Sequence, residues 1–331
     1  MINIAINGFG RIGRNILRAV YERGLDKQFN IVAINDLAST EANAHLLQYD
    51  TTHGRFNQIV SFTEDSISVD GKVIPAFMQR DPANLPWGDL DVDIVLECTG
   101  FFRTRELASK HLTAGAKKVL VSAPGKGLDA TVVFGVNDSE IGPNSQLISN
   151  ASCTTNCLAH VASAMHSSIG IVSGLANTVH AYTNTQNLLD SYHKDKRRGR
   201  AASYSMIPTS TGSAKAIGQV IPDLDGKLDA VAVRVPTINV SLLDLTFLAT
   251  RKTSLQEIAD IFEVYKEGRS GVFNVSNVPL VSIDFNHDPN SCVVDIEQTR
   301  INGQLVKVQA WYDNEWGFSN RMLDTASRMQ Q

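Results

Sequence analysis

Apolar and polar positions alternate along the first third of the chain in a way that predicts short buried strands separated by helices. Short apolar, largely β-branched runs lie within residues 3–7 and 30–35, each of which begins and ends with asparagine, and a stretch with helical periodicity, residues 11–23, lies between them. The same order returns later, with strands over 92–96 and 118–121 on either side of a helix over 104–114. Such alternation is typical of a parallel sheet covered on both faces. We predict a Rossmann-type, doubly wound α/β domain.

The pattern changes near residue 150. Residues 149–157 are dense in small polar side chains and precede a predicted helix over 158–167. Longer strands with fewer helices between them then follow, at 170–179, 230–236, 241–249 and 304–312. This pattern predicts an α+β domain with a mixed or antiparallel sheet. We place the first domain at residues 1–150 and the second at 151–314.

Length and charge restrict the function. The 331 residues exceed the roughly 250 to 300 that one core usually serves, which agrees with two domains. The formal net charge is −4, so no overall positive field attracts nucleic acid or an anionic membrane. No apolar run reaches the roughly eighteen residues of a membrane span, and residues 2–6 begin directly on a strand pattern. We expect a cytoplasmic protein that acts on small molecules, without nucleic-acid or membrane partners.

A glycine motif follows the first predicted strand and opens the first predicted helix. Gly8, Gly10 and Gly13 have the G-x-G-x-x-G spacing of dinucleotide-binding turns. The first glycine permits the tight turn, the second a close approach to pyrophosphate, and the third close helix–strand packing. Asp36 ends the second strand, where a carboxylate can accept hydrogen bonds from a ribose diol and repel a 2′-phosphate. The motif predicts NAD as cofactor; a turn or helix cap is the alternative for Asp36.

Four cysteines are present, and Cys153 has the most suggestive position. It lies at the predicted start of a helix, where the dipole and free amides lower a thiol pKa. Cys157, one turn further, is expected to be buried, and Cys98, within an apolar strand, and Cys292 are expected to be small core residues. Zinc binding by Cys153 and Cys157 is disfavoured because no second ligand pair accompanies them. No metal site is predicted.

Three further features are ambiguous from the residues alone. His180 ends an apolar run beside a polar loop and is a candidate base, although a structural histidine is the commoner case. Residues 209–213 form either an anion-binding nest or an ordinary helix cap. Arg234 interrupts an apolar strand and requires an anionic partner, either a ligand or an internal carboxylate.

The motifs together resemble one family. Residues 6–14, 151–157, 210–212 and 311–315 are similar, in order and across the whole chain, to phosphorylating glyceraldehyde-3-phosphate dehydrogenases. The resemblance implies that Cys153 forms a thioester with the substrate, that His180 is the base, and that a resting thiolate–imidazolium pair keeps the nucleophile charged. Inorganic phosphate then cleaves the thioester. A small phosphorylated aldose and inorganic phosphate are the implied reactants.

The resemblance also implies roles for other residues. Further contacts to NAD are assigned to Arg11, Ile12, Arg80, Ser122 and Asn314. The substrate phosphate is assigned to Thr183 and Arg234, and the attacking phosphate to Ser152, Thr154, Thr211 and Gly212, with a contribution from Arg198. A homotetramer is implied, with loop 183–205 between subunits. The last helix, within about residues 315–331, is expected to return to the nucleotide domain.

Two alternatives remain at this stage. Residues 233–240 and 282–289 also resemble erythrose-4-phosphate dehydrogenase, in which the acyl intermediate is hydrolysed to 4-phosphoerythronate; the Ser210–Gly212 phosphate loop favours the phosphorolytic enzyme. A nucleotide-sensing protein without turnover, its basic residues 194–200 binding RNA, is a third hypothesis, which the joint presence of thiol, histidine and both anion loops disfavours. Ser191 and Tyr192 depart from the family pattern and weaken the expected exclusion of NADP.

Overall fold

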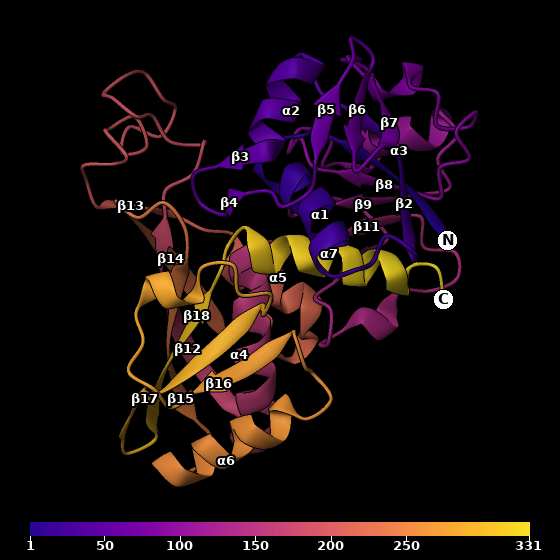
Figure 1. The fold of residues 1–331 in the computed structure, drawn as a ribbon. Coiled ribbons are helices and arrows are strands. Elements are labelled where there is room, and N and C mark those ends of the chain that lie inside the picture. The colour runs from indigo at the N-terminus through magenta and orange to yellow at the C-terminus, as the bar shows by residue number, and fades with distance from the viewer. The chain divides into compact units, whose positions relative to one another are not determined.

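The computed structural model describes residues 1–331, which form two compact units (Figure 1). Unit 1 comprises residues 1–132, 138–151 and 319–331, and unit 2 comprises residues 133–137 and 152–318. None of the helices has the length and apolar character needed to cross a membrane.

Unit 1 is built on a nine-stranded sheet with the order β10-β11-β9-β8-β1-β2-β7-β6-β5. The strands from β10 to β7 are parallel, and β7, β6 and β5 form an antiparallel edge. The elements of the sheet and its helices are β1 (Ile2–Asn7), α1 (Arg11–Glu22), β2 (Phe29–Asn35), α2 (Thr40–Gln48), β5 (Val60–Phe62), β6 (Ser66–Val69), β7 (Lys72–Phe77), β8 (Ile94–Glu97), α3 (Arg105–Thr113), β9 (Lys118–Val121), β10 (Ala130–Thr131) and β11 (Leu147–Ser149). A separate hairpin joins β3 (Tyr49–Asp50) and β4 (Gly54–Arg55).

The central strands of unit 1 are buried on both faces. Every side chain of β8 is inaccessible to solvent, as are Ile4, Ala5 and Ile6 of β1. This burial explains why these strands are continuous apolar runs rather than alternating ones. The predicted doubly wound α/β fold is confirmed. The antiparallel edge was not predicted, because its strands are short and partly exposed.

Unit 2 contains a seven-stranded mixed sheet with the order β13-β14-β12-β15-β18-β17-β16. This sheet confirms the predicted α+β architecture, and Ser241–Ala249 was predicted to the residue. Its elements are α4 (Cys153–Ile169), β12 (Ile171–Ala181), β13 (Ile207–Ser210), α5 (Ser213–Val220), β14 (Leu228–Val235), β15 (Ser241–Ala249), α6 (Leu255–Lys266), β16 (Phe273–Ser276), β17 (Cys292–Asn302) and β18 (Leu305–Tyr312). The last helix, α7 (Trp316–Arg328), begins in unit 2, and its residues from Ser319 onward belong to unit 1.

The C-terminal residues, from Ser319, belong to unit 1. Within that unit Asp324 accepts a hydrogen bond from Arg23 at 3.0 Å, and the Thr325 hydroxyl donates to the Asn150 side chain at 2.8 Å. The beginning and the end of the chain therefore build the same compact unit.

Candidate active site

Strand pairing brings His180 and Arg234 together in unit 2. β12 and β14 are parallel neighbours whose register sets His180 opposite Arg234. β13 pairs with the other side of β14, where Ile207 lies opposite Arg234. Three adjacent strands thus meet around one histidine and one arginine that are far apart in sequence.

Cys153 is the first residue of α4. The hydroxyl of Ser152, the N-cap, accepts a hydrogen bond from the Thr155 N–H at 3.1 Å. This cap starts the helix at the cysteine, so unpaired N–H groups and the positive end of the helix dipole lie near the thiol. Cys153 Sγ is 3.6 Å from Nε2 of His180. The predicted nucleophile and base are neighbours.

The other ring nitrogen of His180 faces the backbone. Nδ1 lies 2.7 Å from the Ala181 carbonyl oxygen, and the same carbonyl accepts a hydrogen bond from Arg234 Nη1 at 2.9 Å. Nδ1 therefore has two possible roles, because Arg234 Nη1, which can only donate, also lies 2.7 Å from it. If Nδ1 carries the proton and donates to the carbonyl, Nε2 presents its lone pair to the sulfur, and this tautomer suits a base that takes the thiol proton.

The surroundings of the pair disfavour charge on either group. Burial and, next, the charge of Arg234 lower the pKa of His180 to about 3. Burial raises the pKa of the Cys153 thiol, and Arg234 and the Thr154 N–H offset part of that effect. These environments favour a neutral thiol beside a neutral imidazole. They do not favour the resting ion pair expected from the resemblance, because burial penalises the charged form of both groups.

Arg234 has no carboxylate partner. Nη1 contacts Ala181 and lies 2.7 Å from His180 Nδ1, and its buried Nε has no hydrogen-bond partner. Burial lowers the pKa of Arg234, and the nearby charge of Arg198 acts in the same direction. The internal ion pair considered from the sequence is therefore absent. Two cations without full compensation make this region suitable for binding an anion.

Arg198 connects the long loop after β12 to β13. It donates to the Thr209 hydroxyl at 2.9 Å and to the Thr185 hydroxyl at 3.3 Å, and Thr185 in turn contacts the hydroxyl of Thr183 at 2.9 Å. Asp195 lies 3.7 Å from Arg198 Nε and compensates part of its charge. The loop candidates Thr183 and Arg198 therefore belong to one hydrogen-bonded group.

The remaining phosphate candidates lie at helix starts. Thr154 is in the first turn of α4, Gly212 is the N-cap of α5, and the Thr211 hydroxyl accepts a hydrogen bond from the Ser213 N–H at 3.3 Å. None of the hydrogen bonds of Ser152, Thr211 or Gly212 reaches Arg234. Arg198 connects the loop to one of these helix starts, because its Nη2 donates to the Ser210 carbonyl at 3.4 Å, directly before Thr211.

Two residues without an assigned role support this site. The Tyr312 hydroxyl contacts Thr154 at 2.9 Å and Thr178 at 2.7 Å, and its ring packs edge-on against His180. Ser241 accepts a hydrogen bond from the Ala181 N–H at 3.2 Å and donates to Asn314 Oδ1 at 2.8 Å. Because Asn314 uses its oxygen for Ser241, its amide nitrogen remains available as a donor. Tyr312 belongs to a noted motif, but Ser241 had no distinguishing sequence signal.

A pocket of about 400 Å³ lies in unit 1, at the carboxyl ends of β1, β2 and β8. Because β1 lies between β2 and β8, this is a topological switch point, the usual ligand position in such sheets. The lining residues are Asn7, Gly8, Gly10, Asn35, Asp36, Leu37, Gln79, Arg80, Cys98, Thr99, Phe101 and Phe102. The prediction of Cys98 as a strand core residue was wrong, since it follows β8 and lines this pocket. A larger hollow of about 880 Å³ beside α2 contains no predicted site residue.

Comparison with protein families decides the relationship. Residues 2–105 match the model for the glyceraldehyde 3-phosphate dehydrogenase NAD binding domain, and residues 152–314 match the model for the C-terminal domain of the same enzymes. This chain belongs to the glyceraldehyde-3-phosphate dehydrogenase family.

Relatives within this family match over nearly the whole chain. Plasmid and chromosomal glyceraldehyde-3-phosphate dehydrogenases of Cupriavidus necator are each 58% identical over 98% of this chain and 97% of their own length. The enzyme of that name from Pseudomonas aeruginosa is 56% identical over the same shares. The resemblance stated from the motifs is confirmed, and NAD is confirmed as the family cofactor. None of these names favours the erythrose-4-phosphate alternative.

The unit 1 pocket fits the family's cofactor. A Cβ added to Gly10 would meet nothing within 4 Å, so backbone at the start of α1 is open to a ligand. Asp36 and Arg80 line the same pocket, and the Asp36 carboxylate also accepts hydrogen bonds from the N–H groups of Phe9 at 2.7 Å and Ala38 at 2.9 Å. Asp36 therefore has the turn-stabilising contacts considered from the sequence as well as a place at the pocket.

The other cofactor candidates have different surroundings. Arg11 pairs with Asp50, the Ser122 N–H donates to the Glu97 carbonyl at 2.9 Å, and Asn314 belongs to unit 2. Ile12 follows Arg11 in the first turn of α1 and is partly exposed. These four residues do not line the 400 Å³ pocket.

Gly13→Ala is expected to raise the Kd for NAD about tenfold or more, which corresponds to a loss of about 1.4 kcal/mol of binding free energy. A Cβ at Gly13 would lie 2.2 Å from the Gly8 carbonyl oxygen, so the turn at the start of α1 must move. Calorimetric titration with NAD checks this. Gly142→Ala is the control, because its Cβ would meet only the Ser145 hydroxyl, at 3.7 Å. Equal affinities of the two variants would contradict the expectation.

Acid is expected to destabilise the wild type more than His180→Asn. The unfolded histidine takes up its proton near pH 6.5, whereas the folded one resists protonation down to about 3. This contribution to stability is therefore present above pH 6.5 and is lost as pH falls toward the folded value. Denaturant unfolding at several pH values should show an excess loss in the wild type of up to about 1.4 kcal/mol per pH unit. If the free energies of unfolding of the two proteins changed equally with pH, a depressed pKa of His180 would be excluded.

Proposed function

We propose that this chain is the phosphorylating, NAD-dependent dehydrogenase of D-glyceraldehyde 3-phosphate, which forms 1,3-bisphosphoglycerate in glycolysis and gluconeogenesis. The observation that carries the proposal is the 3.6 Å contact of Cys153 Sγ with His180 Nε2, beside the Arg234 guanidinium, which has no carboxylate partner. Nucleophile, base and anion site occur together, as oxidation of a phosphorylated aldehyde through a thioester requires. The names of the relatives support the substrate.

The residues of unit 2 suit the acyl-transfer steps. His180 Nε2 takes the Cys153 proton as sulfur bonds to the aldehyde carbon, and the resulting hemithioacetal oxygen is protonated by the imidazolium. His180 then removes that hydroxyl proton as the carbon is oxidised to the thioester. The Cys153 backbone N–H, at the first position of α4, is suited to stabilise the developing oxyanion. NAD, when bound, supplies the hydride acceptor.

Arg234 has two effects in this proposal. It binds the substrate phosphate with Thr183, and the bound anion offsets the charge that lowers the pKa of His180; Arg198 contributes to the site of the attacking phosphate. Substrate binding thus increases the basicity of the histidine that must act next.

Ser152, Thr154, Thr211 and Gly212 are proposed to hold the attacking inorganic phosphate, which expels the Cys153 sulfur and forms the acyl phosphate. Gly8, Gly10, Arg11, Ile12, Gly13, Asp36, Arg80, Ser122 and Asn314 are proposed to hold NAD.

Initial rates of NADH formation test the function. The purified protein should oxidise D-glyceraldehyde 3-phosphate with NAD, and omission of inorganic phosphate should abolish steady turnover while leaving at most one equivalent of NADH per Cys153. Erythrose 4-phosphate should be the poorer substrate. Sustained turnover without phosphate would indicate hydrolysis of the acyl intermediate, and absence of NADH with both aldoses would remove the proposal.

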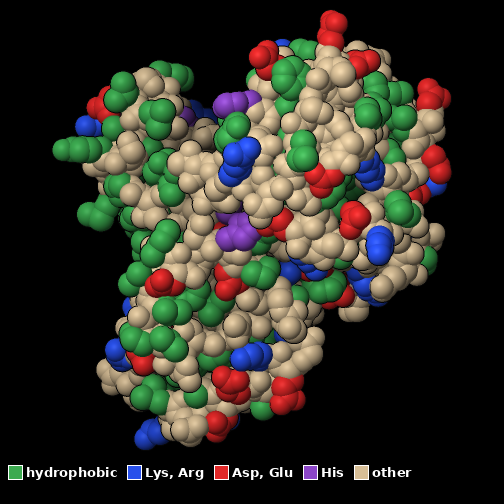
Figure 2. Space-filling view, viewed as in Figure 1, with side chains coloured by type: hydrophobic (Ala, Val, Ile, Leu, Met, Phe, Trp, Pro, Cys, Tyr) green, Lys and Arg blue, Asp and Glu red, His purple; other side chains and the backbone are tan.

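We expect a homotetramer in which the loop after β12 is covered by other subunits. Five large apolar side chains are mostly exposed on or beside this loop, which forms the upper-left lobe of Figure 2: Leu188, Leu189, Tyr192, Tyr204 and Met206. Such a concentration of apolar surface is typical of an interface. Light scattering should give about four times the 36.1 kDa of one chain, and Leu189→Asp should reduce the assembly. A monomeric wild type would contradict this expectation.

A reducing cytoplasmic location suits the four free thiols.

A further inference from the structure

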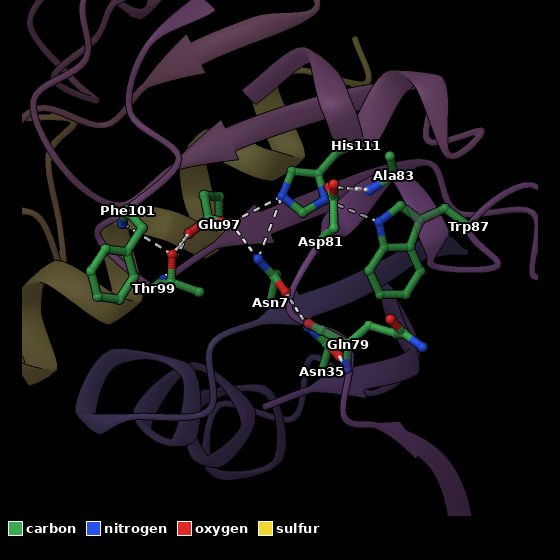
Figure 3. A network of polar contacts seen from close by, with 10 residues as sticks. All are labelled: Asn7, Asn35, Gln79, Asp81, Ala83, Trp87, Glu97, Thr99, Phe101 and His111. Atoms are coloured by element: carbon green, nitrogen blue, oxygen red, sulfur yellow. Dashed lines mark hydrogen bonds and ion pairs between the residues drawn. The ribbon is translucent and has the colours of Figure 1, made fainter. Parts of the chain in front are cut away.

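A buried carboxylate and a buried histidine lie in unit 1 and have no place in the proposed chemistry. Glu97, the last residue of β8, and His111, in α3, both have 0% exposed side-chain surface. Glu97 Oε2 lies 3.0 Å from His111 Nε2 (Figure 3). Burial of two titratable groups is costly unless every polar atom is paired, so their partners indicate what the pair does.

The hydrogen-bond directions in this network are fixed by its donors. Trp87 Nε1 can only donate, and it lies 3.0 Å from His111 Nδ1, which must therefore accept. The His111 proton is then on Nε2 and is donated to Glu97. Asn7 Nδ2 donates to the same Glu97 oxygen at 2.5 Å, and the Thr99 N–H donates to the other at 2.8 Å, together with the Thr99 hydroxyl. The carboxylate thus accepts from both sides.

The network continues to the wall of the pocket. Asn7 Oδ1 accepts from Asn35 Nδ2 at 2.7 Å, and Asn35 accepts from the Gln79 N–H at 2.8 Å and donates to the Gln79 carbonyl at 2.9 Å. Asn7, Asn35, Gln79 and Thr99 all line the 400 Å³ pocket. Through its direct and indirect partners, Glu97 therefore connects wall residues that end or follow four parallel strands, β1, β2, β7 and β8.

The glycine turn rests on this network. A Cβ at Gly8, whose φ is 92°, would lie 2.6 Å from the Thr99 nitrogen. The Gly8 backbone is thus packed directly against the residue that Glu97 holds by two hydrogen bonds. If Thr99 is displaced, either the glycine turn at Gly8 or the part of the pocket wall that Thr99 forms must move.

We propose that Glu97, oriented by His111 and Trp87, is a positioning residue that sets the affinity of the unit 1 pocket for NAD. The inference rests on the proposed cofactor site and extends it to side chains that the cofactor does not touch. Asn7 and Thr99 transmit the effect, because their positions depend on a carboxylate that accepts on both oxygens. A role limited to the stability of the fold would leave affinity in the folded protein unchanged.

Glu97→Gln tests the proposal with a side chain of the same shape. A glutamine amide turns its NH₂ toward either the Thr99 donors or the Asn7 and His111 donors, so one set loses its acceptor. Titration of the folded variant with NAD should give a Kd raised about tenfold, with kcat at saturating NAD within about threefold of the wild type. The control is Asp93→Asn, immediately before the same strand, where Asp93 accepts from the Asn3 N–H and from Lys117, both at 2.8 Å. Its Kd should equal that of the wild type.

The outcomes separate this proposal from the cofactor assignment. A wild type that fails to bind NAD would refute the assignment, whereas a wild type and a folded Glu97→Gln variant with equal Kd would refute only the positioning role. Thr99→Val is used if Glu97→Gln does not fold, because it removes one donor to Glu97 at a partly exposed position. It should raise the Kd several-fold relative to Thr113→Val, which removes a hydroxyl from the exposed face of α3. Equal Kd values for these two threonine variants would likewise overturn the proposal.

Discussion

Cys153→Ser is expected to lower kcat by about 10⁴-fold or more while leaving the Kd for NAD unchanged, as loss of a nucleophile does in other covalent enzymes. Sulfur is the reacting atom, and a hydroxyl in its place is far less acidic than a thiol. Nε2 of His180, whose basicity burial reduces, cannot compensate for that difference. NAD binding is expected to persist because the glycine turn and Asp36 belong to unit 1.

The measurement is NADH formation under saturating substrate, paired with calorimetric titration of NAD. Cys157→Ser is the matched control. Cys157 lies one turn further along α4, is fully buried and has no role in the proposed mechanism. Substantial turnover in Cys153→Ser, or an equal loss in both variants, would be incompatible with Cys153 as the nucleophile.

His180→Asn is expected to lower kcat by about 10² to 10⁴-fold, the usual contribution of a positioned base. Asparagine cannot take the thiol proton, so the thiolate must form by ionisation to solvent, and burial disfavours that ionisation. The rate of the variant should therefore rise with pH over the range in which the thiol itself ionises. Measurement of kcat and of iodoacetamide reactivity between pH 6 and about 10 provides the profile.

His166→Asn provides the comparison, since His166 lies at the end of α4 and its Nδ1 accepts a hydrogen bond from the Ile171 N–H at 3.0 Å. Its turnover should remain close to that of the wild type. A His180→Asn variant whose kcat and pH profile match the wild type would show that another group takes the proton.

The parts predictable from sequence are those fixed by neighbouring residues. The glycine turn, the helix that starts at Cys153 and the apolar central strands each depend on a local pattern. The sequence could not show that β12 and β14 pair in the register that sets His180 opposite Arg234, because strand pairing is non-local. Without the family resemblance, His180 would have remained one histidine among eight.

Electrostatics was the least predictable property. The helix start at Cys153 favours a thiolate, but the pKa of a thiol also depends on how deeply other segments bury it, and here burial is the larger effect. The absence of a carboxylate near Arg234 is likewise a property of the packed chain. Glu97 and His111 gave no signal because the residues that join them, Asn7, Trp87 and Thr99, come from separate segments.

The return of residues 319–331 to unit 1 has a consequence for synthesis on the ribosome. Translation proceeds from the N-terminus, so the sheet of unit 1 emerges long before the segment that contributes Asp324 and Thr325 to it. The nucleotide-binding unit reaches its final composition only after the codons for residues 319–331 have been read, whereas residues 152–318 are by then already available to fold. Termination of translation just before residue 319 would therefore damage the half of the protein that is made first.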